Sequence, residues 1–209
     1  MPTGSIFTAG VSGIAAKLAG IATAVAAIVM SVATASPPVH SVEHLDLMRF
    51  GGVWFEVARL PNKMQSRCRH DATATYRLQV DGGLEVIHRC RDADDRVAVS
   101  VGHAALSGND PARLSLSYVP PWLSWWPGTH ADHWVVMIDE GYRHAVVSDP
   151  SRGSLWILSR LPGIDAATYD DIIARLRAQR FPVERLVLTP QHVQQQVVSP
   201  SVAPPRLTV

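Results

Sequence analysis

Residues 72–91 read ATATYRLQVDGGLEVIHRCR and decide the fold of this chain. In the first half, apolar and polar residues alternate, which is the pattern of a strand with one buried face. The segment Asp81-Gly82-Gly83 tolerates the backbone of a tight turn, and a second β-rich run follows it. The stretch therefore predicts an antiparallel hairpin whose strands cover residues 72–80 and 84–91.

Short β-rich runs separated by turn residues continue on both sides of this hairpin. The predicted strands cover residues 53–60, 72–80, 84–91, 97–106, 113–119, 133–138, 144–147 and 155–160. An open sheet of this size would leave two unpaired edges, whereas closing it removes them and leaves an interior for one small ligand. We therefore predict an all-β fold, an eight-stranded antiparallel up-and-down β-barrel.

One helix is predicted after the last strand. Asp165 is a suitable N-cap, and arginines near the end of the segment suit the negative end of the helix dipole. Its narrow apolar stripe consists of Tyr169, Ile172, Ile173 and Leu176. We expect this stripe to pack against the outside of the barrel. Pro182 ends the helix, and residues 185–188 are predicted to form a short extra strand.

Three motifs, in order along the chain, resemble those of the lipocalin family. Residues 52–59, GVWFEVAR, resemble the G-x-W motif that opens the lipocalin barrel, and Asp139 with Tyr142 matches the second motif. Residues 155–162, LWILSRLP, resemble the third motif in the form typical of bacterial lipocalins and apolipoprotein D. The resemblance supports a lipocalin domain at residues 41–191. It implies the binding, storage or transport of a small apolar ligand, such as a fatty acid or lysophospholipid, in the bacterial cell envelope.

The strands offer candidate ligand contacts, because their apolar residues alternate with polar ones and should face inward. These candidates are Ala72, Ala74, Tyr76, Val86, His88, Leu114, Leu116 and Tyr118. The alternative is that the same side chains simply fill a core. Trp54 and Arg160 are expected to stack at the closed end, where they have a structural role. Arg67, Arg69 and Arg91 are expected near the open mouth, where an acidic headgroup could pair with them.

Residues 120–127, PPWLSWWP, join the fifth and sixth strands. An apolar cluster in a loop is unfavourable in water unless it meets another apolar surface. We expect Trp122, Trp125 and Trp126 at the open mouth, where they would gate ligand entry and make transient contact with a lipid surface. The alternative is that these side chains pack back on the barrel rim.

The first 35 residues contain no acidic residue and one basic residue, Lys17, followed by the apolar residues 18–32 and a small-residue triplet. This pattern is typical of a signal peptide, here residues 1–35. A membrane anchor is the alternative, but the run is short and weakly apolar. No cysteine follows the run to accept a lipid, so we expect an exported protein, periplasmic or secreted, that is not lipid-anchored. An oxidising compartment favours a disulfide between Cys68 and Cys90 over two buried thiols.

The remaining features exclude several function classes. The chain has 19 basic and 18 acidic side chains, which gives no general attraction for nucleic acid. His130 and His133 lack a third ligand of matching spacing, so neither a metal nor another cofactor is expected. No catalytic motif is present, and we predict no enzyme; the rival is a small hydrolase or isomerase that uses His88, Tyr76 or a free Cys68. Residues 192–209 show no periodic apolar face and are predicted to be a disordered tail.

Overall fold

The computed structural model describes residues 36–192. The predicted signal peptide and the predicted tail beyond His192 lie outside the described residues. Among residues 36–192, no helix is long and apolar enough to cross a bilayer.

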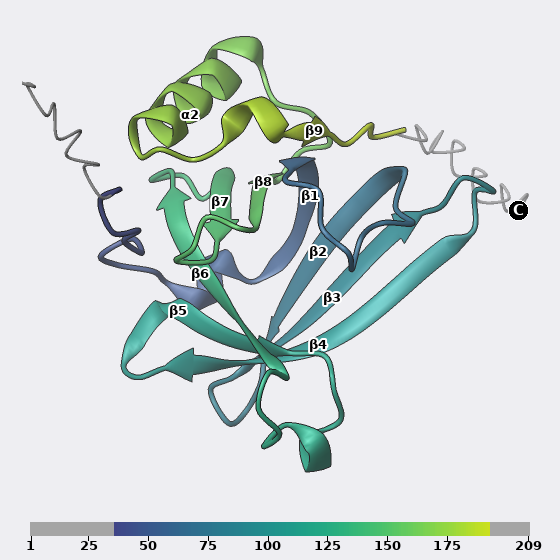
Figure 1. Cartoon of the computed structure of the whole chain (residues 1–209), viewed down its shortest axis with the longest axis vertical. Helices are drawn as coiled ribbons and strands as arrows, with labels where there is room; N and C mark the ends of the chain where they lie inside the picture. Colours follow the sequence, from purple (N-terminus) through teal and green to yellow (C-terminus); the bar gives the residue numbers. More distant parts are fainter. Residues whose placement is uncertain (1–35, 193–209) are drawn as a thin grey trace, which may run out of the picture. The chain divides into compact units, whose positions relative to one another are not determined.

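The described residues form the predicted antiparallel barrel (Figure 1). Its strands are β1 (Gly52–Arg59), β2 (His70–Leu78), β3 (Leu84–Arg91), β4 (Val97–Ser107), β5 (Asp110–Ser117), β6 (His130–Ile138), β7 (His144–Ser148) and β8 (Leu155–Ser159). Each strand pairs with the next, and β1 pairs with both β8 and β2, which closes the sheet. β6 begins before the predicted residue 133, because residues 130–132 continue the pairing with β5.

The seam between β1 and β2 is completed by the C-terminal segment. β1 and β2 pair only as far as Phe55 and Thr73, and the short strand β9 (Val187–Leu188) pairs with the end of β1 instead. Gln191 follows β9 and donates from Nε2 to the main-chain oxygens of Glu56 at 2.8 Å and Ala72 at 2.9 Å. The predicted extra strand therefore exists, but it covers only residues 187–188 of the predicted 185–188, because Arg185 ends a 3-10 helix. Its segment fills the upper part of the seam.

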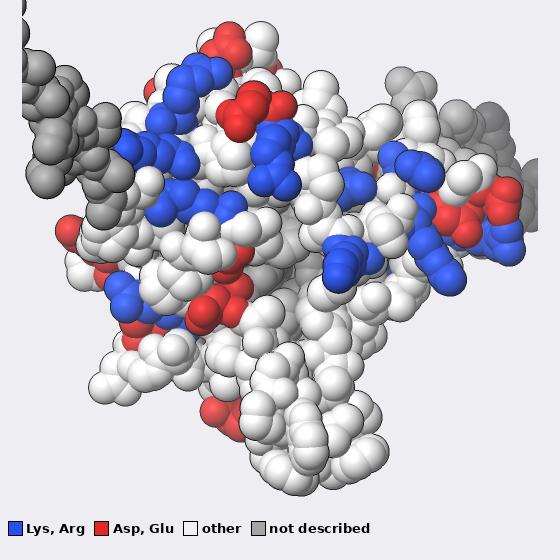
Figure 2. All heavy atoms as spheres, viewed as in Figure 1, with Lys and Arg blue, Asp and Glu red and all other residues white. Residues whose placement is uncertain are grey.

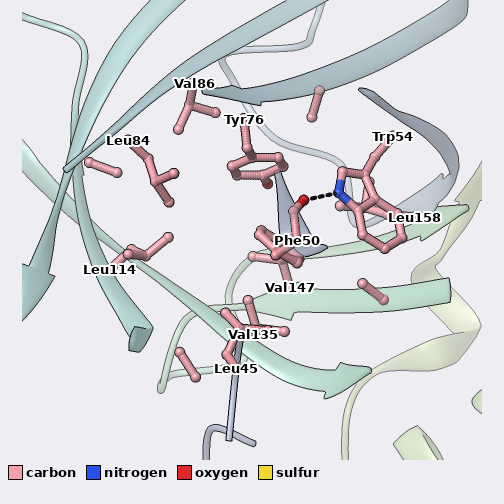
Figure 3. Packing of buried hydrophobic residues seen from close by; sticks show 14 of the residues in the cluster. Leu45, Phe50, Trp54, Tyr76, Leu84, Val86, Leu114, Val135, Val147 and Leu158 are labelled. Atoms are coloured by element: carbon pink, nitrogen blue, oxygen red, sulfur yellow. Dashed lines mark hydrogen bonds between the residues drawn. The ribbon is translucent and has the colours of Figure 1, made fainter. Parts of the chain in front are cut away.

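A short helix, α1 (Leu47–Phe50), crosses the base of the barrel, with Asp46 as its N-cap. Trp54 is fully buried, and its indole Nε1 donates to the main-chain oxygen of Phe50 at 2.8 Å (Figure 3). The guanidinium carbon of Arg160 lies 3.7 Å from the centroid of the Trp54 ring. Arg160 also donates to the main-chain oxygens of Val53 and Gly51, both at 2.8 Å. This one side chain therefore connects the beginning of β1 to the end of β8.

The helix α2 (Ala166–Ala178) begins after its predicted cap, Asp165, whose carboxylate accepts from the main chain of Thr168 at 2.9 Å. Its buried residues Ile172 and Leu176 belong to an apolar cluster with outward-facing strand residues such as Ile157, so the predicted stripe packs against the outside of the barrel. Two short 3-10 helices, Pro121–Leu123 and Val183–Arg185, complete the described elements.

Cys68 and Cys90 form the predicted disulfide, with a Cα–Cα distance of 5.5 Å. The bond joins the β1–β2 connection to β3. Both cysteines are buried against Ala72 and Ala98. The connection is therefore fixed over the end of the barrel at which β1 and β3 finish.

Candidate functional site

The lower interior of the barrel is a packed core. Five of the predicted ligand contacts lie in it, each at most 4% exposed: Ala74, Tyr76, Val86, Leu114 and Leu116. Phe50 from α1 and Trp54 from β1 fill the space between them (Figure 3). Tyr118 packs against the edge of this cluster, and Ala72 packs on the disulfide instead. These positions correspond to the alternative of a filled core.

A neutral hydrogen-bonded pair lies at the centre of this core. The Tyr76 hydroxyl is 2.8 Å from Nε2 of His133, which is 3% exposed. Burial lowers the pKa of His133 to about 3 and raises the pKa of Tyr76 well above its usual range. His130, which the sequence places beside His133, is exposed, and its Nε2 lies 2.7 Å from the main-chain oxygen of Ser124. The two histidines therefore do not share a site.

The low pKa of His133 predicts that acid destabilises the fold. His133 stays neutral in the folded protein to about pH 3, whereas in the unfolded chain its pKa is about 6.5. The unfolded state therefore binds more protons below about pH 6.5, and stability is lost as the pH falls through that window. We expect His133 to account for about 2 kcal/mol between pH 7 and pH 5.

Urea unfolding of the wild type and of His133→Gln at both pH values measures this effect. Glutamine keeps a nitrogen near Nε2 but does not titrate, so the difference in unfolding free energy between the two proteins should change with pH. A pH-independent difference would contradict the prediction.

A buried polar network lies above this core. A carboxylate oxygen of Glu56 accepts from Arg59 at 2.6 Å, and its other oxygen accepts from the Gln65 amide at 2.6 Å. The Gln65 oxygen in turn accepts from the Trp156 indole at 2.7 Å, and the Thr189 hydroxyl donates to Glu56. An irregularity in the β1–β8 pairing between Glu56 and Ala58 turns Arg59 to the same side as Glu56. The network satisfies charges that would otherwise be costly to bury.

A cavity of about 330 Å³ lies at the mouth, between the β1–β2 connection and strands β3 and β4. It is lined by residues 63–68, residues 88–90 and residues 98–100. Three of these residues, Lys63, Arg67 and Arg89, are basic and none is acidic. Figure 2 shows Lys and Arg atoms over the β1–β2 connection. Such a cavity favours a molecule that combines an apolar part with an anionic group.

Of the predicted ligand contacts, His88 lines this cavity. Burial lowers its pKa, so the ring is neutral at pH 7. Ser100 pairs with His88 across β3 and β4, which places both on one side of the sheet, and Val101 is on the other side. Arg69 and Arg91 do not line the cavity, and Arg91 pairs with Asp95.

The tryptophan loop, residues 120–127, lies outside the barrel. Trp122, Trp125 and Trp126 are 73%, 72% and 56% exposed, so they do not pack as rim core. The loop was expected over the mouth, but Val119 and Ser124 instead line a hollow with the β2–β3 turn, at residues 79–84. The reason is that the pairing of β5 with β4 stops at His103, well short of Val97 where β4 begins at the mouth, so the loop leaves the sheet early (Figure 1).

The loop has a defined shape. The Trp125 indole donates to the main-chain oxygen of Trp122 at 2.8 Å, and the Thr129 hydroxyl donates to the main-chain oxygens of Ser124 and Trp126. Residues 118–129 contain no charged side chain, and the loop forms the uncharged lower part of the face in Figure 2.

Comparison with known sequences gives one consistent result. The lipocalin-like domain family matches residues 45–191. A temperature-induced lipocalin-1 from Arabidopsis thaliana is 33% identical over 160 residues, which span 76% of this chain and 86% of the relative. The outer membrane lipoprotein Blc of Escherichia coli K12 is 33% identical over 166 residues, which span 78% of this chain and 90% of the relative.

Solved structures give the same fold. The cockroach allergen Per a 4 aligns with a TM-score of 0.55 at 18% identity, over 71% of this chain and 89% of the allergen. Lobster apocrustacyanin A1 aligns with a TM-score of 0.54 at 17% identity, over 70% of this chain and 79% of that protein. At these identities the likeness supports the fold alone.

Proposed function

Because this chain belongs to the lipocalin-like family, we propose that it binds a small apolar ligand with an anionic headgroup, of the fatty-acid or lysophospholipid class. The observation that carries this proposal is the mouth cavity, which combines three basic side chains with the disulfide, Met64 and Ala98. Its volume of about 330 Å³ lies near the lower end of the range for small-molecule sites. The absence of acidic lining residues suits the anionic group, and the neutral His88 ring suits the apolar part of the ligand.

The expected affinity is moderate. Burying a chain of about fourteen methylenes contributes about 11 kcal/mol gross, at about 0.8 kcal/mol each. Association costs of about 4 to 15 kcal/mol oppose it. Micromolar binding is therefore the expected order of magnitude, and the contacts of Lys63, Arg67 and Arg89 with the headgroup would set selectivity.

Filling the mouth cavity tests the function directly. Ser100→Trp adds an indole beside His88, and we expect the affinity for a fluorescently labelled C16 fatty acid to fall at least about tenfold, which corresponds to about 1.4 kcal/mol. Val101→Trp is the matched control, because this neighbour is 46% exposed and faces the other side of β4. Fluorescence titration of both variants measures the effect. If both variants bind with the affinity of the wild type, the ligand does not bind in the mouth cavity.

We propose that the protein acts in the bacterial cell envelope. The bacterial relatives are named outer membrane lipoproteins, and the pattern of residues 1–35 favours export. Their name indicates a lipid-bearing protein, whereas the sequence of this chain predicts no lipid anchor. The intact mass of the mature protein, purified from envelope fractions of its native host, distinguishes a chain cleaved after residue 35 from one that carries a lipid.

We further propose that the tryptophan loop touches the lipid surface from which the ligand is taken. Three exposed indoles on an uncharged loop of fixed shape are unfavourable in water but suit the membrane interface. The loop lies away from the mouth cavity, so this contact would hold the barrel at the membrane rather than gate ligand entry.

Replacing Trp122, Trp125 and Trp126 together with serine is expected to slow fatty-acid transfer from phosphatidylcholine vesicles several-fold. Unfolding free energy should change by less than about 0.5 kcal/mol, because the side chains are exposed. Met48→Ser and Leu161→Ser remove exposed apolar side chains elsewhere, at 75% and 70% exposure, and should leave transfer unchanged. Unchanged transfer in the triple variant would refute the membrane contact.

A further inference from the structure

Two histidines and an aspartate converge outside the barrel, where β2 begins and the C-terminal segment passes over it (Figure 1). His70 and Asp71 open β2, and His192 lies 122 residues further along the chain. Nδ1 of His70 is 2.9 Å from Nδ1 of His192 and 3.0 Å from Oδ2 of Asp71. The third separation, between Nδ1 of His192 and Oδ2 of Asp71, is 3.9 Å.

The backbone holds these groups together independently of any bound molecule. The Asp71 main-chain nitrogen donates to the Pro190 oxygen at 2.9 Å, and the His192 main-chain nitrogen donates to Oδ1 of Asp71. Asp71 has φ of 53°, at an irregularity of the β2–β3 pairing. This backbone conformation is uncommon for a residue other than glycine, and aspartate tolerates it better than most. Oδ2 of Asp71 thereby remains available to face the two rings.

We propose that His70, Asp71 and His192 bind one divalent transition-metal ion. The three separations define a triangle whose corners are all about 2.0 Å from one central point, which is a normal metal–nitrogen distance. Two pairs of ligands subtend nearly right angles there, and the third pair lies nearly opposite. The three atoms thus occupy three corners of a square, and tetragonal sites of nitrogen and oxygen ligands suit Cu²⁺ or Ni²⁺.

The surrounding charges also favour a cation. Nε2 of His70 lies 3.5 Å from Oδ1 of Asp95, which is the carboxylate–histidine arrangement that orients metal-binding imidazoles. Arg91 opposes the ion, because its Nε is 3.7 Å from Oδ2 of Asp71, but it also pairs with Asp95 at 3.5 Å. Two carboxylates therefore face one guanidinium, and the local charge is negative when both histidines are neutral. An open hollow of about 780 Å³ bordered by these residues provides access.

The ion would stabilise the seam between β1 and β2. The segment that carries His192 also carries Thr189, which bonds Glu56 in the buried network, and Gln191, which bridges β1 and β2. A ligand that binds the folded state alone stabilises it by mass action. Metal binding would therefore stabilise the closed seam beside the buried network.

Calorimetric titration of the full chain, prepared without a histidine tag, with Cu²⁺ or Ni²⁺ tests the proposal. We expect one ion per chain, and His70→Ala and His192→Ala should each weaken binding at least about tenfold, since even outer-shell changes cost about that much. His130→Ala is the matched control, because His130 is an exposed histidine of β6 outside the cluster. Absent binding, or affinity unchanged in both cluster variants, would overturn the proposal.

A spectroscopic readout separates direct ligands from indirect effects. The electron paramagnetic resonance spectrum of the Cu²⁺ form should show coupling to two imidazole nitrogens in the wild type and in His130→Ala, and to one in each cluster variant. His192 is exposed, so its replacement should leave the fold intact by circular dichroism. Two-nitrogen coupling retained in His192→Ala would refute the site.

Discussion

Replacing Trp54 with alanine is expected to lower the free energy of unfolding by about 3 to 5 kcal/mol, the usual cost of removing a large aromatic side chain from a core. Trp54 is fully buried between Phe50 and the guanidinium of Arg160, and its indole nitrogen donates to the Phe50 oxygen. Alanine would leave a cavity and would remove both the indole hydrogen bond to Phe50 and the ring on which the Arg160 guanidinium stacks. Denaturant unfolding followed by circular dichroism measures the change.

Trp122→Ala is the matched control, because the same residue type is 73% exposed there and should cost less than about 0.5 kcal/mol. The Trp54 variant should bind the labelled fatty acid with normal affinity under conditions where it is folded, since Trp54 does not line the mouth cavity. Normal stability together with abolished binding would assign Trp54 to the ligand site instead of the base.

The fold was predictable because its signals are local. Alternation around Asp81-Gly82-Gly83 identifies a hairpin without knowledge of the rest of the chain, and the spacing of Ile172 and Leu176 identifies the buried stripe of α2. Closure of the barrel then follows from the cost of unpaired edges. The points at which neighbouring strands stop pairing could not be predicted in this way. The position of the tryptophan loop depends on where β5 leaves β4, at His103, and no residue pattern marks that point.

The buried network was not predictable, because its members are far apart in the chain. No partner for Glu56 is evident in the sequence, yet its carboxylate accepts hydrogen bonds from Gln65 in the β1–β2 connection and from Thr189, which is 133 residues away. Regular alternation would also place Glu56 and Arg59 on opposite faces, and only the irregularity in the β1–β8 pairing brings them together. The metal cluster has the same origin, since His192 reaches β2 only through the docked C-terminal segment.

Inward alternation identified which side chains face the interior but not whether they leave space. Ala74 suggested room for a ligand, but Phe50 enters from the base and packs against Tyr76, with ring centroids 4.8 Å apart. The volume that remains near the mouth depends on how the β1–β2 connection folds over it. Sequence periodicity does not predict the conformation of this connection. The disulfide does constrain it, because it ties the connection to β3.

Removing this disulfide with the double substitution Cys68→Ser and Cys90→Ser is expected to lower the free energy of unfolding by about 3 kcal/mol, the usual effect of opening a loop of this size. The bond closes a loop with a sequence separation of 22. It also holds the β1–β2 connection where the Cys68 main-chain oxygen accepts from Arg59 at 3.2 Å and Gln65 reaches Glu56.

The same double variant should bind the labelled fatty acid more weakly, because Cys68 and Cys90 line the mouth cavity. Urea unfolding with and without dithiothreitol provides the control: the reductant should destabilise the wild type to the level of the variant and leave the variant unchanged. A loss below about 0.5 kcal/mol would mean that the network of Glu56, Arg59 and Gln65 fixes the connection by itself. A full loss of stability with unchanged affinity would instead place the ligand away from the disulfide, and so away from the mouth cavity.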